Sequence, residues 1–83
     1  MLPQHVSLET FEISPRFRRS IEDRIVKLER DADADEALLA SLSHDDHIRR
    51  QIRLVAAQRV EAQRMRRFLE RARTRLPRPV STL

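Results

Sequence analysis

The segment Ser43-His44-Asp45-Asp46-His47 holds every residue type of a hydrolase triad. The groups of a triad converge on one reacting atom from distant positions of a chain. Consecutive residues of a helix instead point about 100° apart, because the helix has about 3.6 residues per turn. The segment therefore predicts no catalytic residue, and nothing else in the sequence supplies a convergent nucleophile, base or cofactor loop. We expect that the protein is not an enzyme.

Two other patterns could bind a metal ion. His44 and His47 place two imidazoles three residues apart, but no third ligand follows at the spacing of a metal site. The alternating aspartates of residues 31–35 begin like a calcium-binding loop. However, Glu36 stands where the sharp turn needs glycine, and Leu42 stands where a bidentate glutamate closes the loop. The sequence therefore predicts no metal site and no cofactor.

An arginine stripe is the strongest chemical feature of the C-terminal half. Its members recur at helical spacing on the side opposite to the apolar residues, and they are Arg50, Arg53, Arg64, Arg67, Arg71 and Arg75. Arginine binds phosphate through two parallel hydrogen bonds, so the stripe predicts contact with an RNA or DNA backbone. Only Phe68 lies near the stripe, so we expect such binding to depend on shape and charge more than on base stacking.

Two other interpretations of the stripe stay open. A charged helix face is often simply solvated. An anionic membrane surface is also conceivable, but the chain has no tryptophan to anchor it there, so a membrane partner is not expected.

Composition limits the fold and the compartment. The 83 residues make one domain at most, and they include no glycine, no cysteine and no tryptophan. Missing glycine argues against tight hairpins and phosphate-binding loops, and missing cysteine removes disulfides and thiolate chemistry. No apolar run is long enough for a membrane span and no signal-peptide pattern begins the chain, so we expect a cytoplasmic protein.

Charge is divided unequally along the chain. Residues 1–43 hold six basic and nine acidic side chains, whereas residues 44–83 hold eleven basic and four acidic ones. This asymmetry is typical of a basic surface for nucleic acid, or of an acidic helix folded against a basic helix. Both can hold in one molecule.

The elements that position these residues can be read from caps and periodicity. Residues 1–14 form an extended arm or a short strand, because their apolar residues alternate weakly. Ser14 followed by Pro15 predicts the start of a helix over residues 15–42. Ser43 as a cap, with Asp46 in capping-box register, predicts a second helix over residues 44–76. Pro77 ends it, and residues 77–83 form a flexible tail.

Two long helices joined by a short turn run antiparallel, so the predicted fold is an all-α helical hairpin. Each helix has an apolar stripe, and a single hairpin encloses no core. We therefore predict that two copies form a four-helix bundle, a homodimer. The predicted interface with the second copy or another partner consists of Phe17, Ile21, Ile25, Leu28, Leu39, Leu42, Ile48, Ile52, Val55, Met65, Leu69 and Leu76.

Asp35 interrupts the stripe of the first helix, and Arg59 interrupts that of the second. Counted from a turn near Ser43, the two positions differ by about 12 Å of helix length. We therefore expect no pair between them within one chain. Asp35 is instead predicted to mark a bend or an exposed edge.

The segment FEISPRFRRSIEDRIVKLERDAD, residues 11–33, resembles the start of ribosome hibernation promoting factors, also called sigma-54 modulation proteins. In that family a strand leads into a helix that opens with Ser-Pro, here Ser14-Pro15, and ends with a string like Lys27-Leu28-Glu29-Arg30. The family places three strands between its two helices, where this chain has only about ten residues. The resemblance implies a reduced, helical relative that binds ribosomal RNA of the small subunit through its second helix.

The leading prediction is therefore a small basic binding protein that associates with nucleic acid or a ribonucleoprotein through the arginine stripe. The alternative is a coiled-coil adaptor or an antitoxin-like module. In that alternative the apolar stripe or the arm docks on another protein, and the arginines only keep the chain soluble.

Overall fold

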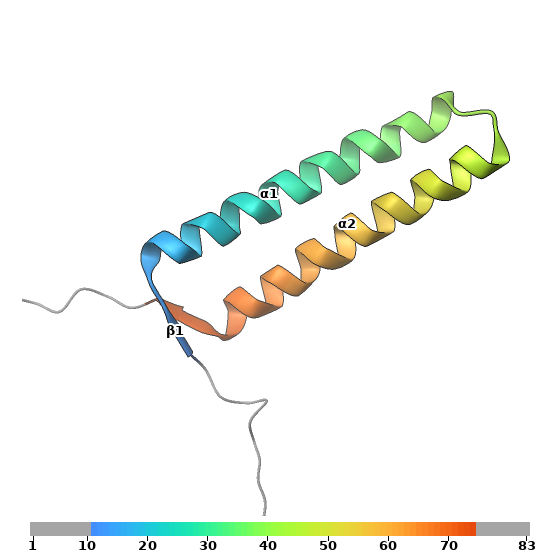
Figure 1. The fold of residues 1–83 in the computed structure, drawn as a ribbon. Coiled ribbons are helices and arrows are strands. Elements are labelled where there is room, and N and C mark those ends of the chain that lie inside the picture. The colour runs from blue at the N-terminus through green and yellow to red at the C-terminus, as the bar shows by residue number, and fades with distance from the viewer. Residues whose placement is uncertain (1–10, 75–83) are drawn as a thin grey trace, which may run out of the picture.

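The computed structural model describes residues 11–74, and within them the chain is an antiparallel helical hairpin (Figure 1). Strand β1 (Phe11–Ile13) leads into helix α1 (Pro15–Ala37), and a 3-10 helix, η2 (Leu38–Ser41), follows. Helix α2 (Asp45–Arg71) returns alongside α1 and ends in strand β2 (Ala72–Thr74). The predicted hairpin of two long amphipathic helices is confirmed.

The start of α1 follows the sequence signal. Ser14 is the N-cap with extended backbone, φ −72° and ψ 155°, and its Oγ accepts a hydrogen bond of 3.1 Å from the backbone N–H of Phe17. Pro15 occupies the first turn, where the missing N–H has no helical acceptor in any case. The predicted helix start is confirmed.

The first helix ends earlier than predicted. It continues through the aspartate run as an α-helix to Ala37, but residues 38–41 tighten into η2, so the predicted end at Leu42 was wrong. The Ser41 hydroxyl donates to the carbonyl of Leu38 at 2.8 Å, and Leu42 is extended, with ψ 138°. A side chain that competes for backbone acceptors favours this short-range turn over a further α-helical turn.

The second helix also begins and ends differently. Its N-cap is His44 and no side chain caps it, so the predicted Ser43 cap was wrong; Asp45 and Asp46 in the first turn still suit the helix dipole. It ends at Arg71 rather than residue 76, because residues 72–74 pair with β1 instead. Leu76 and the predicted tail lie outside the described residues.

The two strands lie at the open end of the hairpin (Figure 1). They pair in parallel, with Phe11 opposite Ala72 and Ile13 opposite Thr74. Since the helices are antiparallel and the strands are parallel, the two strands cannot both continue the direction of the helices that they adjoin, and the chain bends at the junctions of strand and helix. This pairing satisfies backbone groups that a frayed helix end would leave to water.

The core is a narrow seam between α1 and α2. Ile13, Ile25, Ala62 and Leu69 form its buried cluster, with six partly buried apolar side chains packed against it. Most of the predicted interface therefore packs within one chain. Of that set the structure buries Ile25, Val55 and Leu69, half-buries Ile21, Leu28, Leu39, Leu42, Ile48 and Met65, and leaves Phe17 and Ile52 about half exposed.

Within residues 11–74, neither helix has the length and apolar character needed to cross a membrane.

Candidate nucleic-acid interface

The arginines of α2 divide between two sides of the helix. One group lies on the side that faces acidic residues of α1, and we call this cluster the ion-pair flank; it consists of Glu29, Asp33 and Glu36 of α1 with Arg59 and Arg66 of α2. A second group lies on the side turned away from α1, and we call it the outer arginine edge; it consists of Arg50, Arg53, Arg64, Arg67 and Arg71.

Three contacts build the ion-pair flank. Arg59 Nη2 donates to Asp33 Oδ1 at 3.2 Å and to Glu36 Oε1 at 2.6 Å. Arg66 donates through Nε at 3.0 Å and through Nη2 to one carboxylate oxygen of Glu29. Hydrogen bonds to Asp33 first and Glu36 second raise the pKa of Arg59 above its usual value. These two guanidinium groups are thus committed to acids of their own chain.

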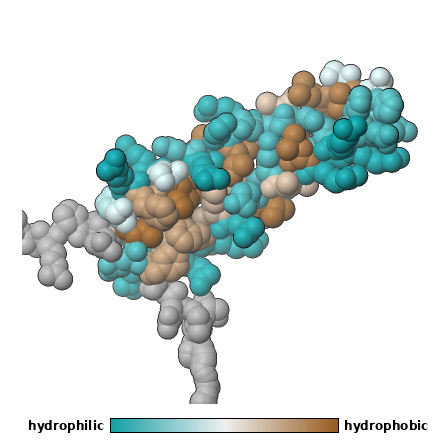
Figure 2. Space-filling view, viewed as in Figure 1, coloured by the Kyte–Doolittle hydropathy of each residue, from teal (hydrophilic) through white to brown (hydrophobic). Residues whose placement is uncertain are grey.

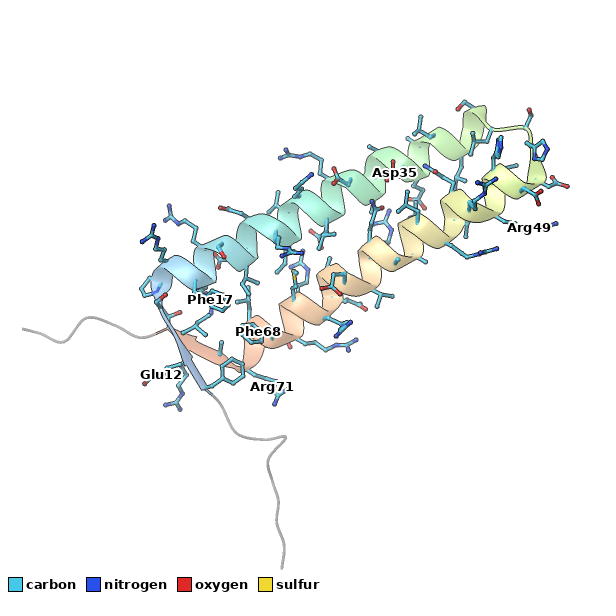
Figure 3. All side chains as sticks on the ribbon, in the orientation of Figure 1. Glu12, Phe17, Asp35, Arg49, Phe68 and Arg71 are labelled. Atoms are coloured by element: carbon cyan, nitrogen blue, oxygen red, sulfur yellow. The ribbon has the colours of Figure 1, made fainter. Side chains whose placement is uncertain are left out.

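The outer arginine edge is different because most of its members have no acidic partner within residues 11–74. Arg50, Arg53, Arg67 and Arg71 are exposed, and none of them makes an ion pair there. Arg64 makes only a loose pair with Glu61, at 3.4 Å, and its side chain is 72% exposed. Figure 3 shows Arg71 at the end of α2 near the two strands. Arg75 lies outside the described residues.

The edge has a defined spacing. Arg50 and Arg71 are 21 residues apart, which corresponds to about 32 Å of helix. Two groups lie within that length, Arg50 with Arg53 and Arg64 with Arg67 and Arg71. The exposed side chain of Val60 lies between them in sequence. A row of this length matches about nine base pairs of duplex, along which phosphate charges follow every ~1.7 Å of axis.

The turn of the hairpin explains why Arg59 reaches α1 acids that a simple count excludes. The seven residues between the helices do not merely turn. Four of them rise about 2 Å each in η2, and Leu42 and His44 on either side of Ser43 have extended backbone, so the linker adds more than about 8 Å before α2 begins. The linker thereby brings Arg59 level with Glu36. The prediction placed the turn at Ser43 alone and counted residues from there, and its estimate of the relative heights of the two helices is wrong for that reason.

Asp35 does not mark a bend or an exposed edge, so that prediction was wrong. It lies inside unbroken α1 and is half-buried in the seam. Gln51 Nε2 donates to its backbone carbonyl at 2.7 Å and Gln58 Nε2 to its carboxylate at 3.0 Å, while the buried Oε1 of Gln58 has no partner. The predicted absence of an Asp35–Arg59 pair agrees with these contacts, because Arg59 binds Asp33 and Glu36 instead.

Aromatic rings gather at the open end, which sequence reasoning missed. The ring of Phe68 lies 4.8 Å from that of Phe11 and 6.2 Å from that of Phe17, measured between centroids. Figure 3 shows Phe17 and Phe68 facing one another across the two helices. The sequence could have indicated this contact only if the periodicity of both chain halves were considered together, since Phe68 is 51 residues beyond Phe17.

The remaining chemical groups do not converge. The rings of His44 and His47 stack at 4.7 Å at the start of α2, but in the described part of the chain no three potential metal ligands gather. An open groove between the helices has Ile25 and Leu69 as its floor. Its rim carries Arg18, Glu22 and Arg66, of which Arg18 and Glu22 pair with each other at 3.3 Å.

The chain matches no protein-family model, and no curated protein or solved structure is similar enough to count as a match.

Proposed function

We propose that this protein is a non-catalytic binding protein that associates with the phosphate backbone of nucleic acid, or of a ribonucleoprotein, through the outer arginine edge. One observation supports this above the others. The chain neutralises Arg59 and Arg66 with its own carboxylates, yet leaves Arg50, Arg53, Arg67 and Arg71 exposed and without an acidic partner in the described residues.

Uncompensated guanidinium groups on a rigid helix favour a polyanion for a physical reason. Each phosphate that they neutralise releases condensed counterions, and this release supplies affinity without reading bases. The helix fixes the spacing of the arginines, so their side chains have to be ordered on binding but the backbone that carries them does not. Recognition would therefore follow the shape and charge of the nucleic acid. Because residues 11–33 resemble hibernation factors, ribosomal RNA is the nucleic acid that we propose first as the ligand.

The test is the salt dependence of binding. We expect the logarithm of the affinity for a short RNA or DNA duplex to fall linearly with the logarithm of salt concentration, with a slope of about 0.9 per neutralised phosphate for B-DNA. Replacing Arg64, Arg67 and Arg71 together by Gln should lower that slope by about two to three. Circular dichroism should remain that of the wild type, because these side chains are exposed.

A matched control removes the same charge from the opposite edge of the hairpin. Arg16, Arg19 and Arg30 of α1 are also exposed and have no ion pair within residues 11–74. The triple Gln variant at these positions should change the slope by less than one. Equal losses in the two variants would mean that only net charge matters and would contradict a binding edge on α2.

A wild-type protein that binds neither duplex nor structured RNA at low salt would exclude the proposal. In that case the alternative, a coiled-coil adaptor or antitoxin-like module for another protein, would replace it. A first indication is available from the purified protein, since bound nucleic acid raises the ratio of absorbance at 260 and 280 nm until a high-salt wash removes it.

A further inference from the structure

Charge is divided unequally between the two ends of the hairpin. The open end consists of residues 11–24 and 64–74, and it holds nine basic and four acidic side chains, a net charge of +5. The turn end, residues 25–63, holds six basic and eight acidic side chains, a net charge of −2. An anionic ligand is therefore attracted to the open end, where Arg64, Arg67 and Arg71 of the outer arginine edge also lie.

The aromatic rings of the protein lie at the same end. Phe11, Phe17 and Phe68 are the only aromatic residues of the chain besides histidine, and we call them the aromatic cluster. The rings of Phe11 and Phe17 both contact the ring of Phe68. Figure 2 shows hydrophobic surface gathered at the open end of the hairpin. The most basic part of the molecule is thus also its aromatic part.

Phe17 is the most exposed member of the aromatic cluster. It is 47% exposed, whereas Phe11 and Phe68 are half-buried. The ring planes of Phe17 and Phe68 make an angle of 83°, which is an edge-to-face contact. Such a contact uses the edge of one ring and one face of the other, so at least one face of Phe17 is not covered by Phe68.

Phe68 connects the aromatic cluster with the outer arginine edge. It lies four residues after Arg64 and three before Arg71, and residues at these separations are neighbours on the surface of a helix. Both arginines are exposed, and within residues 11–74 their only ion pair is the loose one of Arg64 with Glu61. A chain of nucleotides whose phosphates bind these arginines therefore lies beside the aromatic cluster.

Stacking on a protein ring needs a base with a free face. Inside a duplex each base already stacks on its neighbours, so proteins stack aromatic side chains on the unpaired bases of single strands, loops and ends. Arginines next to an exposed ring are the combination that binds single strands, because the arginines hold the backbone and the ring holds a base. The sequence alone indicated little stacking, since Phe68 was the only ring near the arginine stripe; the fold adds Phe17 from the other helix.

We propose that the outer arginine edge binds a nucleic acid with unpaired bases, a single strand or a single-stranded overhang, and that Phe17 stacks on one of these bases. This inference rests on the proposed function, because the arginines hold the phosphates next to the stacked base. Paired nucleic acid binds through the same arginines but more weakly. No base sequence is preferred, since every base has a face that can stack.

An overhang without bases tests the stacking while the charge stays the same. The probe is a short RNA duplex with an overhang of about four adenosines, and its control has the same overhang with abasic sites. The wild type should bind the adenosine overhang at least about fivefold more tightly, measured by fluorescence anisotropy. The salt dependence of the two affinities should be equal, because both probes have the same number of phosphates.

Two substitutions of exposed apolar side chains form a matched pair. Phe17→Leu keeps an apolar side chain but removes the ring, and it should reduce the preference for adenosine over abasic sites to less than about twofold. Ile52 is similarly exposed, at 51%, and lies one heptad before Arg59 on the ion-pair flank. Ile52→Ala should keep the preference of the wild type. Circular dichroism of both variants checks that the helices are retained.

Phe17→Trp gives a direct signal of the stacking. The chain has no tryptophan, so the introduced indole is its single fluorophore of that kind. An indole also stacks on bases, so the variant should bind the adenosine overhang at least as tightly as the wild type. Its emission should be quenched by the adenosine overhang and not by the abasic one. Equal emission with both probes would contradict a base on this side chain, whether or not Phe17→Leu folds.

The results separate this inference from the proposed function. Equal binding of both overhangs by the wild type, with a steep salt dependence, would overturn the role of Phe17 and leave the outer arginine edge as the binding surface. Failure to bind either probe at low salt would overturn both proposals. Loss of the preference in Ile52→Ala as well as in Phe17→Leu would also contradict stacking on Phe17, because Ile52 belongs to the other flank.

Discussion

The ion-pair flank and the aromatic cluster of Phe11, Phe17 and Phe68 lie along the same seam but contribute to the fold in different ways. On the ion-pair flank, Arg59 and Arg66 reach across to α1 through water-exposed side chains, which fix register and exclude wrong partners more than they stabilise. In the aromatic cluster, Phe68 packs on Phe11 and Phe17 and removes apolar surface from water. Comparing them shows that polar contacts specify this hairpin, whereas apolar contacts hold it together.

Leu69→Asp should have the largest effect, because the ion-pair flank and the aromatic cluster both depend on the seam. Leu69 is 9% exposed and belongs to the cluster of Ile13, Ile25 and Ala62. An unpaired charge there should cost about 3–5 kcal/mol, which exceeds what a single small hairpin can lose. Thermal unfolding followed by circular dichroism should show no cooperative transition. Persistence of a normal transition would mean that the seam is not the core.

Phe68→Ala tests the aromatic cluster. It removes the ring that contacts both Phe11 and Phe17, so we expect a loss of about 2–4 kcal/mol in the free energy of unfolding. Urea denaturation measures it, and the midpoint should fall without a change in the final helical signal of the folded state. A loss below about 0.5 kcal/mol would show that the aromatic contacts are incidental.

The polar cluster in the seam should respond in opposite directions to single and double changes. Asp35→Leu alone removes the carboxylate that accepts from Gln58 Nε2, while the backbone carbonyl of residue 35 still accepts from Gln51, and the change should cost about 1–2 kcal/mol. Asp35→Leu with Gln58→Leu also removes the unpartnered Gln58 Oε1 and should recover that loss or exceed the wild type. Denaturation of the three proteins in parallel measures the difference, and additive losses would contradict a coupled cluster.

Glu29→Gln and Arg66→Gln, singly and together, should have the smallest effect. Their double-mutant cycle should give a coupling of about 0.2–1 kcal/mol, because both side chains are partly exposed. The coupling should fall as salt rises from 10 mM to 1 M. A coupling above about 2 kcal/mol would mean that this ion pair contributes to the free energy of unfolding as much as the phenylalanine contacts do.

The ends of the helices differ in how well the sequence predicts them, because some depend on local contacts and others on distant ones. The start of α1 could be read from Ser14 and Pro15, because a cap is a contact between neighbours in sequence. The end of α2 could not, because β2 forms only when β1 is beside it. For the same reason the length of the second helix was predicted too long.

The candidate interface divides in the same way. Periodicity alone predicts that Arg50, Arg53, Arg64, Arg67 and Arg71 lie away from the apolar stripe, and within residues 11–74 they are exposed. Periodicity could not show that Arg59 and Arg66 form ion pairs with acidic residues of α1. That depends on the length that η2 and the extended residues add to the linker, a quantity that no single helix contains.

The sequence by itself thus determined the existence of two amphipathic helices, their antiparallel direction and the separation of apolar from arginine-rich faces. These follow from local propensity and from a period of 3.6 residues, which act within a few neighbours. Only the tertiary structure decided the register between the helices, the pairing of the two strands, and which arginines of α2 form ion pairs with acidic residues of α1. These features require that residues more than 20 positions apart lie at the same position along the axis of the hairpin. The path of the linker sets that position.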